Sequence, residues 1–322
     1  MKRIGVLTSG GDAPGMNAAV RAVVRTARHR GIEVMGIMRG YHGMIHNEVE
    51  LMGARSVSNI IQHGGTIIKS ARSKEFRNKS GRAKAIRTLR EHGIDGLVLI
   101  GGDGTFTGAI KLLKEWDGKA VGVPGTIDND LYGTDFTLGF DTAVNTALES
   151  IDKIRDTADA HERTFLVEVM GRQAGFIALE AAVAGGAEMA LIPETRTTVK
   201  QVADRLARDK ELGKTSSIIV VAEGDEQGGV VDIARQLRQQ FQMDTRICVL
   251  GHIQRGGAPT AADRLLGSRL GAFAVELLCK GKSGVMAGEV NHKPIAVPFE
   301  HAIKRTKPID KDLLRIADIL AT

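Results

Sequence analysis

The chain has 322 residues, which is long for a single hydrophobic core and enough for two domains. Hydrophobic residues make up 43% of it and charged residues 25%, the composition of a soluble globular protein. No stretch approaches the ~18 apolar residues of a membrane span, and the N-terminal apolar run is too short for a signal peptide. The net charge of +6 is spread along the chain, without a basic tail or interleaved aromatics. This pattern favours small phosphorylated ligands over nucleic acid as partners.

Short apolar, β-branched runs predict strands along the whole chain. The predicted strands are Arg3–Thr8, Glu33–Met38, Gly96–Ile100, Ala120–Val123, Thr164–Val169, Glu188–Ile192, Ser217–Ala222 and Thr245–Leu250. These runs are continuously apolar and do not alternate with polar residues, as is typical of parallel strands that are buried on both faces.

Amphipathic segments between these runs predict helices. The predicted helices are Ala18–His29, Thr142–Ala158, Val199–Leu212, Val230–Phe241, Ala261–Lys280 and Asp310–Leu320. Strands that alternate with helices favour an α/β protein with doubly wound layers. A change of domain near residue 140 is consistent with this order of elements.

Three glycine-rich loops follow predicted strands. Residues 8–17 read TSGGDAPGMN, residues 100–105 read IGGDGT, and residues 124–130 read PGTIDND. Glycines let the backbone approach a ligand closely, and a helix that starts there presents N–H groups to an anion. Ligands of open α/β sheets bind at the carboxyl ends of strands, so together the loops predict a nucleotide-phosphate site.

Carboxylates within these loops point to metal and proton chemistry. Asp103 among phosphate-binding glycines would repel phosphate unless it holds Mg²⁺ between them, although Asp103 also suits a helix N-cap. Asp128 and Asp130 follow an apolar strand and have Thr126 just before them. One of the two carboxylates suits proton transfer and the other suits a metal; a polar turn is the simpler explanation of the same residues.

Five arginines near turns or the ends of predicted strands form a second group, and two of them, Arg172 and Arg255, have a glycine next to them. They are Arg72, Arg163, Arg172, Arg246 and Arg255. Arginine is suited to bidentate recognition of phosphate, but an isolated arginine is more often a solvated surface residue.

The motifs GGDAPGMN, GGDGT, PGTIDND, MGRQAG and GHIQRGG, in this order, make the chain resemble bacterial ATP-dependent 6-phosphofructokinases. The resemblance covers nearly the whole chain and is weakest from about residue 280 onward. It implies two doubly wound domains with mainly parallel sheets and an active site in the cleft between them. Residues 1–139 and about 257–304 would bind ATP, and residues 140–256 and about 305–322 would bind fructose 6-phosphate.

The resemblance also implies a reaction. A cytoplasmic, glycolytic homotetramer would transfer the γ-phosphoryl of Mg-ATP to the 1-hydroxyl of fructose 6-phosphate, with ADP or phosphoenolpyruvate as possible effectors. Asp128 resembles the base, Thr126 and the backbone of Gly11 resemble contacts to the phosphoryl group, and Arg72 and Arg172 resemble its charge partners. Asp103 and Asp130 resemble the Mg²⁺ partners.

The remaining site residues fall into three groups by resemblance. Those around ATP are Gly11, Tyr41, Arg72, Phe76, Arg77, Gly102, Asp103, Gly104, Thr105 and Gly108. Those around fructose 6-phosphate are Thr126, Asp128, Asp130, Met170, Gly171, Arg172, Glu223, His252 and Arg255, with Arg163 and Arg246 reaching the site of a neighbouring subunit. Those of an effector pocket are Arg21, Arg25, Arg55, Arg155, Gly186, Glu188 and Lys214.

Other positions bear on which phosphoryl donor the protein uses and on how effectors regulate it. Pyrophosphate-using relatives carry Asp where this chain has Gly104 and Lys where it has Gly125, so this chain resembles the ATP-dependent pattern. Ala54, Asn59, Leu212, Thr215 and Ser216 depart from the effector pattern, mostly by loss of positive charge. We therefore expect weak or altered inhibition by phosphoenolpyruvate. Phe176 and Lys74 also depart from the family, with no role that the sequence explains.

Three other functions remain open at this point. A related kinase would use another phosphosugar or pyrophosphate, a regulatory protein would bind the nucleotide without catalysis, and a nucleic-acid binder would explain the basic charge. The complete set of Asp103, Thr126, Asp128 and Asp130 favours an active kinase.

Overall fold

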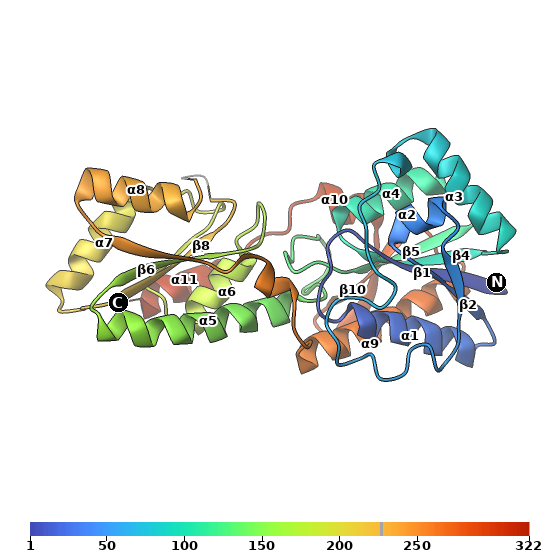
Figure 1. Cartoon of the computed structure of the whole chain (residues 1–322), viewed down its shortest axis with the longest axis horizontal. Coiled ribbons are helices and arrows are strands. Elements are labelled where there is room, and N and C mark those ends of the chain that lie inside the picture. The colour runs from blue at the N-terminus through green and yellow to red at the C-terminus, as the bar shows by residue number, and fades with distance from the viewer. Residues whose placement is uncertain (226–227, 322) are drawn as a thin grey trace. The chain divides into compact units, whose positions relative to one another are not determined.

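The apolar runs of the sequence form two mainly parallel sheets in a computed structural model, which describes residues 1–225 and 228–321 (Figure 1). The strands are β1 Arg3–Ser9, β2 Glu33–Ile37, β3 Val49–Met52, β4 Gly96–Gly101, β5 Lys119–Pro124, β6 Thr164–Val169, β7 Met189–Leu191, β8 Ser217–Ala222, β9 Thr245–Val249, β10 Val285–Val290 and β11 Lys293–Pro298.

The helices lie between these strands. They are α1 Met16–His29, α2 Gly40–Ile45, α3 Lys79–Glu91, α4 Asp103–Leu113, α5 Phe140–Ala160, α6 Phe176–Ala184, α7 Val199–Glu211, α8 Val230–Phe241, α9 Ala261–Cys279, α10 Phe299–Lys304 and α11 Lys311–Leu320. Two 3₁₀ turns, η1 Glu75–Arg77 and η2 Gly251–Arg255, complete the described elements.

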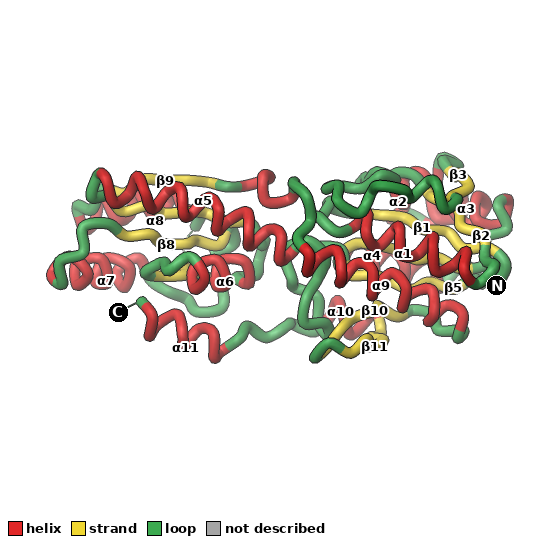
Figure 2. The backbone as a smooth tube through the Cα atoms, turned by 90° about the horizontal axis from the view of Figure 1, so that it is seen from below, coloured by secondary structure: helices red, strands yellow, loops and turns green. Residues whose placement is uncertain are grey.

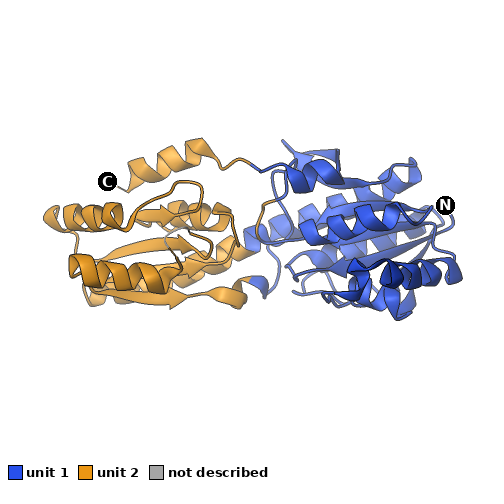
Figure 3. Cartoon of the chain, turned by 90° about the horizontal axis from the view of Figure 1, so that it is seen from above, with its two compact units in different colours: residues 1–127, 131–142, 255–307 blue, residues 128–130, 143–254, 308–322 orange. Residues whose placement is uncertain are grey.

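The chain divides into two compact units, which Figure 3 colours separately. Unit 1 comprises residues 1–127, 131–142 and 255–307. Unit 2 comprises residues 128–130, 143–254 and 308–322. Each unit is therefore assembled from three separate segments of the chain.

Unit 1 contains a seven-stranded sheet in the order β11-β10-β5-β4-β1-β2-β3. The pairs from β10 to β2 are parallel, and β3 and β11 add antiparallel edges. Helices α1 and α9 cover one face, and α2, α3 and α4 cover the other (Figure 1). Because β1, β4 and β5 lie between two helical layers, nearly all their residues are buried, as their continuous apolar runs predict.

Unit 2 contains a four-stranded, fully parallel sheet in the order β7-β8-β6-β9. Helices α7 and α8 pack together on one face, and α5 and α6 lie on the other (Figure 1). The last helix, α11, packs against α6, as Figure 2 shows. None of the helices in the described residues is long and apolar enough to cross a membrane.

All eight predicted strands and all six predicted helices are confirmed, with ends within two residues. The sequence missed β3, β10 and β11, together with α2, α3, α4, α6 and α10. The edge strands β3 and β11 each have only one buried residue, so they lack the apolar run of a buried strand. The alternative role of Asp103 as an N-cap is wrong, because Gly102 occupies that position and Asp103 is the first residue of α4.

Candidate active site

The register of the unit 1 sheet places the three glycine-rich loops side by side at the carboxyl ends of β1, β4 and β5. Ser9 at the end of β1 lies opposite Gly101 of β4, and Gly101 lies opposite Pro124 of β5. The loops are also joined to one another, since the Gly125 N–H donates to the carbonyl of Gly101 at 3.0 Å. The hydroxyl of Thr105 donates to the carbonyl of Ser9, also at 3.0 Å. The loops therefore form one connected surface of backbone groups.

The second loop offers open space and a helix start. Asp103 and Gly104 are exposed in the first turn of α4, and a Cβ atom on Gly104 would meet nothing within 4 Å. The N-terminal N–H groups of a helix attract anions. The turn can thus accept phosphate oxygens beside the Gly104 backbone.

Gly125 in the third loop is constrained by packing. A Cβ atom there would come within 2.9 Å of the Met16 side chain and 3.1 Å of Ile100. A lysine at this position therefore needs a shift of the surrounding core, whereas an aspartate at Gly104 needs none.

Tyr41 and Phe76, expected near the nucleotide, lie in the hydrophobic core of unit 1. Their rings stack with centroids 3.9 Å apart, and the Tyr41 hydroxyl donates to the carbonyl of Thr105 at 2.6 Å. Burial raises the pKa of Tyr41 well above its usual value, so the ring stays neutral and keeps this hydrogen bond. A Cβ atom on Gly108 would come within 2.7 Å of the Tyr41 ring. The stacked rings therefore hold the first turn of α4 in place through the hydrogen bond to Thr105. Arg72 and Arg77, in contrast, are exposed on the surface.

Asp128 belongs to unit 2 and is 2% exposed. Its Oδ2 lies 3.2 Å from Nε of Arg172, whose side chain is 43% exposed. Buried carboxylates are stable as anions only with such partners, so the pair holds a charged oxygen next to a solvent-accessible guanidinium.

The backbone that carries Arg172 is held in an unusual conformation. Gly171 has a φ of 145° and Arg172 a φ of 54°, which costs free energy for a non-glycine residue. The Arg172 N–H donates to Oε1 of Glu223 at 2.8 Å. Glu223, at the end of β8, therefore fixes the turn after β6 from which Arg172 reaches Asp128.

Two buried polar residues that the sequence did not single out position this region. Gln254 is fully buried; its Oε1 accepts the Met170 N–H at 2.9 Å, and its Nε2 donates to the carbonyl of Ala143. Asp263 accepts the N–H groups of Gly139 and Thr142 at 2.7 and 2.9 Å and so caps the start of α5. Desolvation by burial raises the pKa of Asp263, and the hydrogen bonds from Thr142 and Gly139 partly oppose this rise.

Arg163 and Arg246 lie at the amino ends of strands of the unit 2 sheet, whereas Met170 and Glu223 lie at the carboxyl ends. Arg163 precedes β6, and Arg246 is the second residue of β9, where the register places it opposite Phe165. Met170 and Glu223 follow the carboxyl ends of β6 and β8. Strands rise about 3.3 Å per residue, so the length of a six-residue strand separates the two groups. Both arginines are exposed, and His252 is exposed in η2.

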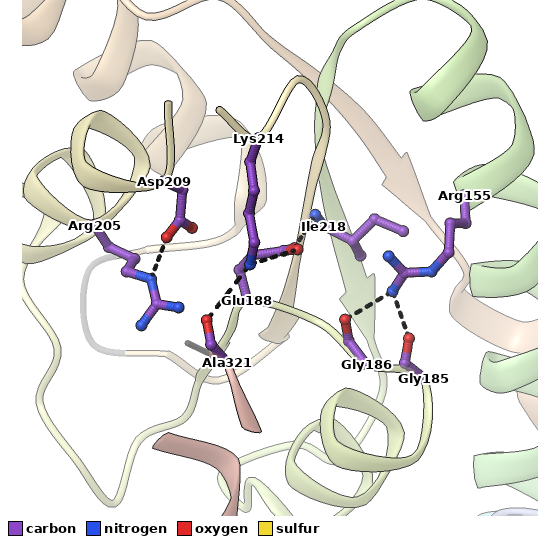
Figure 4. Close-up of polar contacts among 9 residues, drawn as sticks. All are labelled: Arg155, Gly185, Gly186, Glu188, Arg205, Asp209, Lys214, Ile218 and Ala321. Carbon is purple, nitrogen blue, oxygen red and sulfur yellow. Dashed lines mark hydrogen bonds and ion pairs between the residues drawn. The ribbon is translucent and has the colours of Figure 1, made fainter. Parts of the chain in front are cut away.

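The residues expected in an effector pocket divide between the units. Arg21, Arg25 and Arg55 belong to unit 1, and the other four belong to unit 2. In unit 2, Lys214 lies 3.7 Å from Glu188, as Figure 4 shows. Arg155 donates to the carbonyls of Gly185 and Gly186.

Two α/β units with glycine-rich loops at a sheet edge and a buried carboxylate beside an arginine define a protein of the phosphate-binding α/β class. Residues 3–278 match the family model described as phosphofructokinase. A Thermus thermophilus protein named ATP-dependent 6-phosphofructokinase 1 is 60% identical over 321 residues and covers 100% of both chains. A Cytophaga hutchinsonii protein named ATP-dependent 6-phosphofructokinase is 56% identical, over 99% of this chain and 98% of its own.

The solved structure of phosphofructokinase from Saccharomyces cerevisiae has a TM-score of 0.90 with this fold. It is 36% identical over 100% of this chain, which spans 48% of the yeast chain's length. The chain belongs to the phosphofructokinase family.

Proposed function

We propose that this chain is an ATP-dependent 6-phosphofructokinase, a glycolytic kinase that forms fructose 1,6-bisphosphate and ADP. The observation that carries the reaction is the buried Asp128 carboxylate 3.2 Å from the Arg172 guanidinium. The attacking group is an alcohol, and a carboxylate within reach of its proton can act as a general base. Full-length relatives at 52–60% identity that carry this name support the assignment.

In the proposed mechanism, Asp128 accepts the proton of the sugar 1-hydroxyl as the oxygen attacks the γ-phosphorus. Arg172 holds Asp128 before the reaction and neutralises charge on the transferring group, together with Arg72. Thr126 and the Gly11 backbone donate hydrogen bonds to the same group. Phosphoryl transfer depends mainly on positioning and charge neutralisation, which are what these side chains supply.

We propose that Asp103 and Asp130 hold Mg²⁺. Both residues fit Mg²⁺ because it prefers hard oxygen ligands such as carboxylates. Neither residue is fully buried: Asp103 is exposed in the first turn of α4, and Asp130 is half-buried. The described residues contain no group of three acidic, histidine or cysteine side chains placed to hold a metal ion by themselves. Mg²⁺ is commonly bound by one or two carboxylates, water and substrate phosphates, and it neutralises the charge of those phosphates.

We propose that unit 1 binds ATP. The carboxyl ends of the unit 2 strands, where Met170 and Glu223 lie, would bind fructose 6-phosphate. The open space at Gly104 supports ATP as donor, because the nucleotide's α-phosphate needs this room. The location of Arg163 and Arg246 at the amino ends of the strands, away from Met170 and Glu223, supports their action on another copy of the chain. The proposal that the assembly is a homotetramer rests on the resemblance to the family. We further propose a cytoplasmic location and an effector pocket for ADP or phosphoenolpyruvate.

The test is ADP release from Mg-ATP with fructose 6-phosphate, run beside pyrophosphate and beside other sugar phosphates. We expect turnover only with ATP and fructose 6-phosphate. Turnover with pyrophosphate alone would show that the assignment of the donor is wrong. Nucleotide binding without turnover for any pair would favour a regulatory protein.

A further inference from the structure

Residues 53–74, between β3 and η1, form no helix or strand, although they carry Arg72. Side chains of neighbouring elements hold this segment in place. Asn17 of α1 accepts the Ile67 N–H through its Oδ1 at 2.8 Å and donates through its Nδ2 to the carbonyl of His63 at 3.0 Å. Asn17 is 1% exposed. The position of the segment on unit 1 is therefore set by buried hydrogen bonds to its neighbours, since it has no secondary structure of its own.

The end of this segment is fastened to β1 and to the first glycine-rich loop, which follows β1. Thr8, which is fully buried, donates its hydroxyl proton to the carbonyl of Lys69 at 2.7 Å. Lys69 has a φ of 58°, a conformation that costs free energy for a non-glycine residue and that this hydrogen bond helps to hold. The next residue, Ser70, donates its hydroxyl proton to the carbonyl of Gly10 at 2.7 Å. The Ser70 hydroxyl is therefore placed against the glycine-rich loop by a backbone that is itself held.

The hydrogen bond from Ser70 fixes the peptide plane between Gly10 and Gly11. This peptide bond is trans, so its carbonyl oxygen and its N–H point in opposite directions. Glycine on both sides leaves the plane easy to rotate, and Gly10 has a φ of 92°. With the Gly10 carbonyl held by Ser70, the Gly11 N–H points to the other side, where it has no acceptor within the described residues. A hydrogen bond accepted by the carbonyl also polarises the peptide and makes its N–H a stronger donor.

We propose that Ser70 is a positioning residue, which keeps the Gly11 N–H directed at the phosphoryl group that the protein transfers. This inference rests on the proposed function, because it takes the Gly11 N–H as a donor to that group. Without the Ser70 hydroxyl, the peptide plane can turn over and present the Gly10 carbonyl oxygen, which repels phosphate oxygens. Ser70 acts through Gly11 and does not itself touch the substrate.

Arg72, which we propose contacts the same phosphoryl group, is two residues beyond Ser70 and is exposed. Loss of the Ser70 hydroxyl would loosen the backbone before Arg72 and also free the peptide plane between Gly10 and Gly11. In a chain without the Arg72 guanidinium, only the second effect still changes how the phosphoryl group is bound. A variant at Arg72 therefore separates the two routes.

The probes are the Mg²⁺ complexes of ADP and of β,γ-methylene-ATP, an ATP analogue whose terminal phosphoryl group is not transferred. Their affinities are measured by titration calorimetry with the full chain. Ser70→Ala should bind the analogue about fivefold more weakly, because a hydrogen bond to the terminal phosphoryl group is lost. The affinity for ADP, which lacks that group, should be unchanged. Ser70→Thr keeps a hydroxyl and should bind both probes like the natural chain.

Ser268→Ala is the matched control. Ser268 is half-buried like Ser70 and also donates its hydroxyl proton to a backbone carbonyl, that of Arg264 in α9 at 2.8 Å. This variant removes the same kind of hydrogen bond from the same unit, but at a distance from the glycine-rich loops in the sequence. Both affinities of Ser268→Ala should therefore be unchanged.

In an Arg72→Ala background, Ser70→Ala should weaken binding of the analogue by the same factor. In steady-state kinetics, Ser70→Ala should lower kcat about tenfold with little change in the KM for fructose 6-phosphate, because donors to the transferring group act mainly in the transition state. Equal binding of the analogue by Ser70→Ala and Ser268→Ala, or an effect that disappears in the Arg72→Ala background, would overturn the role of Ser70 even in an active kinase. A natural chain that releases no ADP would instead overturn the proposed function, and the binding measurements would still decide the role of Ser70.

Discussion

The guanidinium of Arg255 lies against Gly11, where a Cβ atom would come within 2.9 Å of Nη1 and 3.4 Å of Cζ. Nε of Arg255 is buried and has no hydrogen-bond partner within the described part of the chain. Gly11, which we propose contacts the phosphoryl donor, thus also leaves room for Arg255, which we propose contacts the sugar phosphate.

We predict that Gly11→Ala acts mainly on the acceptor. The added methyl group displaces Arg255, and the loss of a charged hydrogen bond to the sugar phosphate should raise the KM for fructose 6-phosphate roughly 10-fold or more. The KM for ATP should change less. In an Arg255→Ala background, Gly11→Ala should add little, because both changes remove the same contact. An effect on ATP alone would assign Gly11 to the donor only.

Replacement of the proposed base should affect chemistry and spare donor binding. Asp128→Ser removes the carboxylate that accepts the proton, so kcat should fall roughly 10²-fold or more. ATP binding, measured by calorimetry, should be largely kept. Asp156→Ser, on an exposed position of α5, is the matched control and should leave kcat unchanged. Near-normal turnover of Asp128→Ser would remove Asp128 from this role.

Substitutions at Gly104 and Gly125 should have different consequences. Gly104→Asp introduces a side chain into open space, so the fold should be unaffected while the KM for ATP rises through crowding and repulsion of the α-phosphate. Gly125→Lys pushes against Met16 and Ile100, and overpacking of this kind typically costs about 1–3 kcal/mol. Urea unfolding and ATP kinetics on both variants check this contrast. Equal destabilisation by the two variants would contradict it.

Asp263 should make the stability of the protein depend on pH. Because the folded-state pKa of Asp263 is raised above the unfolded value, its contribution to the free energy of unfolding is fully present below the unfolded pKa and is lost as pH rises through the folded one. The advantage of the natural chain over Asp263→Asn should therefore shrink as pH rises above the ordinary pKa of an aspartate. Urea titrations across this range measure the difference, and an advantage that grows with pH would contradict the direction of the pKa.

Inhibition by phosphoenolpyruvate should be weak or altered. Ala54, Leu212, Thr215 and Ser216 lower the positive charge available to an anionic effector, and Lys214 is already close to Glu188. Initial-rate curves against fructose 6-phosphate, with and without phosphoenolpyruvate, test this. Strong sigmoidal inhibition at sub-millimolar concentration would show that the remaining basic residues suffice.

The parallel core and its loops were predictable because their signals are local. Continuous apolar runs identified β1, β4 and β5, and the glycines after them marked the turns that meet at one edge. In the unit 2 sheet, Arg163 and Arg246 stand at the amino ends of β6 and β9, so their distance from Met170 also follows from a local signal.

The buried polar residues that hold the site's backbone in place were not predictable from the sequence. Gln254 and Met170 are 84 positions apart, and Asp263 and Gly139 are 124 apart. A buried polar residue looks like any other in the sequence until its distant partner is known. The burial of Tyr41 and Phe76 has the same origin, because only the packed core shows that they stack on each other.

The three-segment composition of each unit has a consequence for the order of events during synthesis. Residues 1–142 leave the ribosome before α9, which covers α1, and before β10, which pairs with β5. The face of α1 that packs against α9 therefore stays uncovered while residues 143–254 are translated. Unit 2 in turn lacks α11 until residues 311–320 have been translated. Neither unit can complete its packing before its last segment has been made, so the nascent chain exposes core surface until then and suits early protection by chaperones.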